Sequence, residues 1–166
     1  MKDLKQYLDL TGYDNEVRRA RRKTGEKTQE FFTPYEIVKK MCDKIPEEDW
    51  ADPHKTFCEP CFGNGNFVLG IIYYRLSHGV SLEDTFNTLY GVELMEDNVE
   101  ECKQRIFSML DDMELDYDWD ALRDVLDAHL VCCDFFEWNF QEWRKMTSEE
   151  LKNLSKSPKK TNKKNV

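Results

Sequence analysis

The sequence has no apolar run that approaches the roughly 18 to 20 residues required by a membrane-spanning helix. Its first residues alternate charged and apolar side chains, whereas a secretory signal peptide has a basic start followed by a continuous apolar core. These two absences predict a cytoplasmic protein that makes no contact with a membrane.

The sequence also has little that would bind a metal ion. It contains six cysteines and three histidines, but only Cys58 and Cys61 have Cys-x-x-Cys spacing, and no second pair follows as zinc sites require. The acidic stretch 111–120 lacks the glycine and the terminal glutamate of a calcium loop. We therefore expect no metal, a solvated linker at 111–120, and reduced cysteines that pack as small apolar side chains.

Charge is unevenly distributed along this chain, whose net charge is −9. Residues 1–40 carry 10 Lys and Arg against 7 Asp and Glu (+3), residues 41–144 carry 7 against 24 (−17), and residues 145–166 carry 7 against 2 (+5). Because phosphate binding depends on local charge, the basic ends predict weak, sequence-independent affinity for DNA. The alternative is that these cations only keep an acidic protein soluble. The residues expected to contact DNA phosphates at the N-terminal end form a basic cluster: Arg18, Arg19, Arg21, Arg22 and Lys23.

The length of 166 residues predicts one folded domain with terminal extensions. Residues 1–30 are expected to form a basic arm or surface helix, and residues 31–144 the folded domain. Apolar residues nearly vanish from Lys145 onward. Residues 145–166 are therefore expected to be a disordered basic tail, because too little apolar surface is available to offset the entropy of ordering.

Three short apolar runs, at 56–59, 88–92 and 130–133, alternate with segments of helical periodicity. This alternation predicts an α/β fold in which about three parallel strands are joined by crossover helices. A further helix is expected from Thr33 onward, because Thr33 can cap it, proline suits its first position, and Glu36 would complete a capping box.

Each predicted strand ends at residues able to bind a ligand. The first leads into a turn with Gly63 and Gly65, at the crevice position where open α/β sheets bind ligands. Glu93 follows the second strand and can accept hydrogen bonds from ribose hydroxyls. After the third, Asp134 offers an acceptor for an adenine amino group and Phe135 a ring to stack on the adenine. Taken singly, these residues also suit a tight turn, a solvated acid and a core aromatic.

Four segments of the chain resemble motifs X, I, II and III of S-adenosylmethionine (AdoMet)-dependent adenine-N6 DNA methyltransferases. In chain order they are residues 32–34 (Phe-Thr-Pro), 59–67 (Glu-Pro-Cys-Phe-Gly-Asn-Gly-Asn-Phe), 91–93 (Gly-Val-Glu) and 133–135 (Cys-Asp-Phe). The likeness covers roughly residues 24–140. It implies a Rossmann-like class I methyltransferase fold with a partial sheet, AdoMet as cofactor, and a role in bacterial or phage DNA methylation or restriction-modification. The cofactor-binding residues that it implies are Phe32, Thr33, Pro34, Glu59, Pro60, Gly63, Gly65, Asn66, Phe67, Glu93, Asp134 and Phe135.

The resemblance also implies a part for each segment. Thr33 and Pro34 would contact the methionine part of the cofactor, and Glu59 with the turn 63–65 its amino-acid portion. Glu93 would hold the ribose, and residues 134–135 would hold the adenine. Asn66 and Phe67 would support the turn.

One family motif is absent. Adenine-N6 methyltransferases hold the flipped base with an (Asn/Asp)-Pro-Pro-(Tyr/Phe) loop, and the 166 residues contain no such sequence. Asn139 and Phe140 lack the prolines and lie too close to Asp134 for another strand to intervene. We therefore expect methyl transfer only if a partner chain or a second copy supplies the base pocket.

Two other functions were weighed. A catalytically inactive, AdoMet-sensing or DNA-associated accessory protein would keep the cofactor fold without the base pocket. A nicotinamide dehydrogenase is disfavoured, because residues 32–34 have no role in it and the spacing from Gly63 to Glu93 exceeds the usual 20 or so residues.

Overall fold

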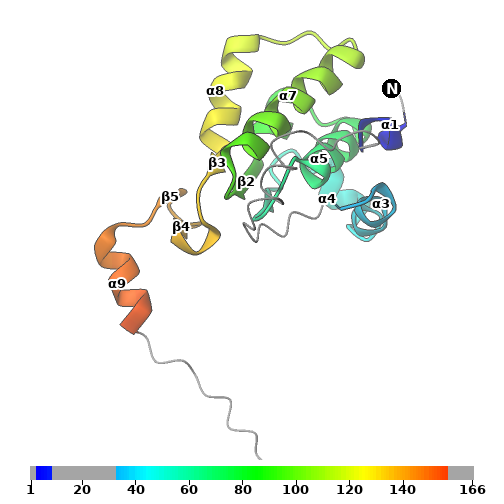
Figure 1. Cartoon of the computed structure of the whole chain (residues 1–166). Coiled ribbons are helices and arrows are strands. Elements are labelled where there is room, and N and C mark those ends of the chain that lie inside the picture. Colours follow the sequence, from blue (N-terminus) through cyan, green and yellow to red (C-terminus); the bar gives the residue numbers. More distant parts are fainter. Residues whose placement is uncertain (1–2, 9–32, 157–166) are drawn as a thin grey trace, which may run out of the picture.

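A computed structural model of the chain describes residues 3–8 and 33–156 (Figure 1). Its helices are α1 (Leu4–Leu8), α3 (Tyr35–Cys42), α4 (Glu47–Ala51), α5 (Asn66–Ser77), α6 (Leu82–Asn87), α7 (Glu96–Asp112), α8 (Trp119–His129), the short 3-10 helix η1 (Phe135–Glu137) and α9 (Ser148–Lys156). Its strands are β1 (Phe57–Glu59), β2 (Leu89–Glu93), β3 (Leu130–Cys132), β4 (Trp138–Asn139) and β5 (Arg144–Lys145). No helix within these ranges has the length and apolar character needed to cross a bilayer.

The main sheet has three parallel strands in the order β1-β2-β3. Phe57 pairs with Leu89, and Gly91 pairs with Leu130. Helix α5 lies between β1 and β2 in the chain, and α7 and α8 lie between β2 and β3. The predicted parallel α/β sheet with three core strands and crossover helices is therefore confirmed.

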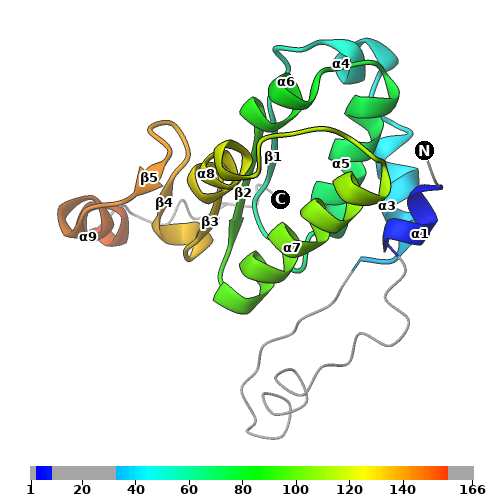
Figure 2. The same cartoon turned by 90° about the horizontal axis from the view of Figure 1, so that it is seen from above.

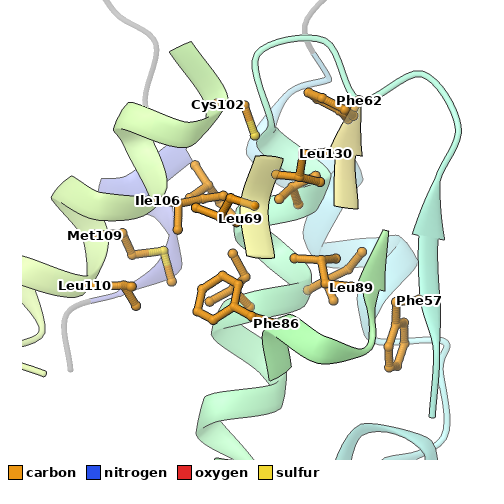
Figure 3. Close-up of a cluster of buried hydrophobic side chains, with 14 of the residues drawn as sticks. Phe57, Phe62, Leu69, Phe86, Leu89, Cys102, Ile106, Met109, Leu110 and Leu130 are labelled. Atoms are coloured by element: carbon orange, nitrogen blue, oxygen red, sulfur yellow. The ribbon is translucent and has the colours of Figure 1, made fainter. Parts of the chain in front are cut away.

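One face of the sheet carries the main hydrophobic core (Figure 3). Leu89 and Leu130 project from the sheet into this core, where they meet Leu69 of α5 and Ile106 and Leu110 of α7, all of which are at most 1% exposed. Burying an aliphatic side chain of this size stabilises a fold by about 1.5–3 kcal/mol. Packing in this core therefore fixes the positions of the strands, and it thereby fixes the positions of the residues that follow each strand.

On the opposite face of the sheet lie the β4–β5 hairpin and α9, in place of the helices α5 and α7 that cover the first face (Figure 2). A small cluster there joins Val92 of β2 and Cys133 to Trp138 of the hairpin. Cys132 is exposed while Cys133 is buried, as expected for neighbours that point to opposite sides of a strand.

Two local expectations were wrong. The N-cap of α3 is Pro34, and no side chain caps the helix. The Thr33 carbonyl instead accepts a hydrogen bond of 2.8 Å from the Asn66 side-chain amide, so a tertiary contact fixes this end of the helix in place of the expected capping box.

Part of the expected disordered tail is helical, because α9 occupies residues 148–156. The cause is a capping box: the backbone N–H of Thr147 donates to the Glu150 carboxylate (2.6 Å), and the backbone N–H of Glu150 donates to the Thr147 hydroxyl (3.3 Å). Arg144 adds two hydrogen bonds of 2.9 and 2.8 Å to the same carboxylate. Residues 157–166 lie outside the described part of the chain.

Candidate functional site

Acidic residues stand at the carboxyl ends of all three parallel strands. Burial raises the pKa of the Cys61 thiol, and the carboxylates of Glu93, Glu59 and Asp134 raise it further. Glu59 and Glu93 are the last residues of β1 and β2, and Asp134 follows β3. Because the three strands are paired in parallel, these acidic residues lie at the same edge of the sheet.

The turn between β1 and α5 depends on two glycines in the left-handed region of backbone conformation. Gly63 has φ 53° and Gly65 has φ 96°, values that side chains with a Cβ rarely adopt. Gly65 is the N-cap of α5, and its N–H donates to the Phe62 carbonyl at 2.9 Å. A Cβ built on Gly65 would lie 2.3 Å from the Sγ of Cys102, so the turn also rests directly on α7.

Glu93 is 8% exposed and already holds the backbone around it. One carboxylate oxygen accepts from the Gly63 N–H (2.9 Å), and the other accepts from the Met95 N–H (3.0 Å) and the Asn98 amide (3.4 Å). This residue therefore ties the glycine turn to the end of β2. A carboxylate offers about four acceptor positions, so Glu93 keeps capacity for a further donor.

Glu59 lies at the carboxyl end of β1 and is partly buried. Burial raises the pKa of its carboxyl group, although a hydrogen bond from the backbone N–H of Cys61 acts in the opposite direction. A desolvated carboxylate gains from any cationic or hydrogen-bonding group placed beside it. Glu59 is therefore suited to hold a positively charged part of a ligand.

Asn64, between the two glycines, is a buried residue whose side-chain amide has no partner among the described residues. Its side chain is 1% exposed, and neither its oxygen nor its nitrogen has a hydrogen bond within residues 3–8 and 33–156. A buried amide left unpaired costs about 1–3 kcal/mol, and such groups occur where a ligand or an ordered water completes the bonding. This orphaned amide marks the turn as a candidate binding position.

Arg105 of α7 organises the turn and was missed by sequence reasoning. Its guanidinium donates to the carbonyl of Asn64 (2.7 Å), to the side-chain oxygen of Asn66 (2.8 Å) and to the carbonyl of Tyr7 (2.9 Å). One side chain thus joins α1, the turn and the start of α5. The available signal was its place three residues after Cys102, beside the apolar face of the predicted helix.

The segment at residues 33–34 reaches the same turn. The carbonyl of Thr33 accepts from the Asn66 side chain, whose oxygen is held by Arg105. Residues that lie far apart in the sequence therefore meet at the start of α5. Phe67, one residue further on, is partly buried against the main core, and Pro60 is partly buried in the turn.

Phe135 follows Asp134 and packs with two other aromatic rings. It is 38% exposed, and its ring lies 5.2 Å from that of Phe136 and 5.1 Å from that of Phe140. Asp134 caps η1 by accepting from the Phe136 N–H at 2.8 Å. The ring expected to stack on an adenine is thus packed with aromatics of the hairpin side.

Several expectations concern residues that the structure does not describe. Phe32 and the basic cluster Arg18, Arg19, Arg21, Arg22 and Lys23 lie outside the described residues. Within residues 3–8 and 33–156, no group of three or more His, Cys, Asp or Glu residues is arranged to hold a metal ion.

Comparisons with protein-family models, with curated proteins and with solved structures find no match to this chain.

Proposed function

We propose that this chain binds S-adenosylmethionine at the carboxyl ends of β1, β2 and β3 and is the cofactor-binding part of an adenine-N6 DNA methyltransferase-like protein. The fold proposed is a partial Rossmann-like class I methyltransferase fold. The observation that carries the proposal is that Glu93 binds the glycine turn and the Thr33 segment binds the start of α5, beside the buried, unpartnered side-chain amide of Asn64 and at the edge where the three parallel strands end.

The residues present fit this cofactor chemically. AdoMet supplies a methyl group on a positively charged sulfonium, and it also carries an ammonium group. The carboxylate of Glu59 would offset the ammonium charge, Glu93 would accept hydrogen bonds from the ribose hydroxyls, and Asp134 would accept one from the adenine amino group. The unpartnered amide of Asn64 would complete its hydrogen bonds on the amino-acid part, and Gly63 and Gly65 let a ligand approach the backbone.

Methyl transfer to a base needs a pocket for that base, and we propose that another chain or a second copy supplies it. The absent Pro-Pro-aromatic loop is the first support. The second is the edge of β1, which within the described residues pairs with β2 on one side and with no strand on the other. Further strands from another chain could extend a parallel sheet at an edge strand of this kind.

The alternative function is an AdoMet-sensing or DNA-associated accessory protein without catalytic activity. Its specific support is Glu93, whose carboxylate oxygens both serve the protein backbone. A residue in this position can couple occupancy of the crevice to the shape of the glycine turn. Methylation assays separate this alternative from the leading proposal.

The first expected result is that the full chain binds AdoMet and its demethylated product in calorimetry, while NAD gives no heat. Replacing Glu93 by glutamine is expected to weaken AdoMet binding tenfold or more, about 1.4 kcal/mol, because the change removes a negative charge and disturbs the Gly63 contact. Glu100→Gln removes a charge from an exposed position of α7 and should leave affinity unchanged. Heat with NAD alone, or equal affinity in both variants, would contradict the proposal.

The second expected result is that the chain alone transfers no methyl group to adenine. Extruding a base costs a few kcal/mol that a pocket must repay, and this chain lacks the base-holding loop. The assay uses tritiated AdoMet with single- and double-stranded unmethylated DNA, with and without lysate of the native host. Label in adenine from the chain alone would refute the need for a partner, whereas label that appears only with lysate would support it.

A further inference from the structure

A pocket lies on the hairpin side of the main sheet, between β1, β2 and the β4–β5 hairpin. Its volume is about 330 Å³, and it is lined by Thr56, Cys58, Tyr90, Phe140, Gln141 and Trp143. This volume lies at the lower end of the range of roughly 300–1,000 Å³ that is typical of small-molecule sites. We propose that it binds a flat, uncharged heteroaromatic ring of the size of a nucleobase.

The walls of the pocket are aromatic rings set at steep angles to one another. The ring of Trp143 lies 4.7 Å from that of Tyr90 at 72° and 6.1 Å from that of Phe140 at 67°. Rings arranged in this way offer a face for stacking and an edge for a perpendicular contact. A flat ligand can therefore meet both kinds of surface at once, as bases do on proteins that bind them by stacking.

The polar groups of the pocket are uncharged. Thr56 contributes a hydroxyl, Cys58 a thiol, and Gln141 an amide that both donates and accepts hydrogen bonds. Among residues 3–8 and 33–156, no lysine or arginine lines the pocket, so this part of the chain offers no counter-charge for a phosphate. Such a lining suits the hydrogen-bonding edge of a heterocycle and gives no advantage to its phosphorylated forms.

The rings are held in place before any ligand binds. Trp143 has φ 49°, a backbone conformation that is rare and costly for a bulky residue. Its indole N–H donates to the carbonyl of Ala128 at 2.9 Å, and its ring packs edge-on against Trp138 at 5.3 Å. Tyr90, which is in direct contact with Trp143, stacks on His129 with ring centroids 4.2 Å apart.

The position of Gln141 is also fixed by the hairpin. The backbone N–H groups of Gln141 and Glu142 both donate to the side-chain oxygen of Asn139, at 3.0 and 3.1 Å. This turn fixes the backbone of Gln141, one of the residues that line the pocket. The pocket shares no residue with the strand-end crevice, so this proposal stands apart from the proposed AdoMet site.

The test uses NMR of the full chain labelled with ¹⁵N, with adenine as the probe. Adenine is expected to shift the indole N–H signal of Trp143, assigned from Trp143→Phe, while the signal of Trp50, which is 1% exposed in the main core, stays in place. Gln141→Ala is expected to weaken adenine binding at least fivefold, and Gln104→Ala, an exposed glutamine of α7, should leave it unchanged. Adenosine and a single-stranded oligonucleotide distinguish a free nucleoside from an unpaired base in nucleic acid.

Saturating AdoMet and the Glu93→Gln variant separate this site from the crevice. Adenine binding that survives both supports the pocket, even if AdoMet itself fails to bind. No shift of the Trp143 signal, equal affinity in the Gln141→Ala and Gln104→Ala variants, or loss of adenine binding when AdoMet is added would overturn it.

Discussion

Replacing Gly65 by alanine is expected to destabilise the protein by about 3 kcal/mol or more, because two costs add. The first is steric, since the new Cβ would lie 2.3 Å from the Sγ and 3.0 Å from the Cβ of Cys102, a fully buried residue of α7. The second is backbone strain, because Gly65 has φ 96° and a residue with a Cβ rarely adopts that conformation. Urea unfolding followed by circular dichroism measures the change.

Gly79 offers a matched control. It has φ 81°, but a Cβ built there would meet no atom within 4 Å. Gly79→Ala should therefore cost only the backbone term, roughly 1–2 kcal/mol. Adding Cys102→Ala to Gly65→Ala should recover part of the loss by removing the nearest atom. Equal losses at the two glycines would show that close packing on α7 is not what requires glycine at position 65.

Replacing Arg105 by alanine is expected to have the second largest effect, and the effect should appear both in stability and in AdoMet affinity. Its three hydrogen bonds reach the backbone of Asn64 and Tyr7 and the side chain of Asn66. Hydrogen bonds from charged groups contribute roughly 1.5–3 kcal/mol each, although neighbouring bonds are not additive. We expect a loss of about 2–4 kcal/mol of unfolding free energy and a tenfold or greater loss of AdoMet affinity.

Arg123 provides the comparison for this variant. It is exposed on α8, and its guanidinium lies 5.7 Å from the centroid of the Phe107 ring. Arg123→Ala should cost less than about 1 kcal/mol, the range of exposed cation–π contacts, and should leave calorimetric AdoMet affinity unchanged. An Arg105→Ala protein that is folded and binds AdoMet with unaltered affinity would contradict the role assigned to Arg105.

The three parallel strands were predictable because each is a short apolar run that ends beside an acidic residue. A strand buried in a parallel sheet must be apolar, so its position is visible in the sequence. The hairpin was not predictable in this way. Its strands β4 and β5 have two residues each, too few for alternation to appear, and their position depends on rings such as Trp143 packing on the sheet. Helix α9 did carry a signal, Thr147 followed by Glu150, which the lysine-rich composition of the segment concealed.

The candidate site was predictable as a set of strand-end acids, whereas the partners of those acids were not. Glu93 accepts the N–H groups of Gly63 and Met95 because buried backbone donors need acceptors. Phe135 packs with Phe136, its neighbour in η1, and with Phe140, which lies between β4 and β5. Arg105 was missed because its acceptors are mainly backbone carbonyls, which no sequence pattern marks.

The open edge of β1 has only three residues, and this length limits what it can do in assembly. Because the Phe57 N–H already donates to the Thr88 carbonyl beside β2, the backbone groups of Cys58 alone face outward from that edge. Two hydrogen bonds of about 0.5–1.5 kcal/mol each cannot offset the 4–15 kcal/mol of lost translational and rotational freedom on association. Indiscriminate strand-to-strand aggregation through β1 is thereby disfavoured, and any lasting complex must draw its free energy from side chains around the edge.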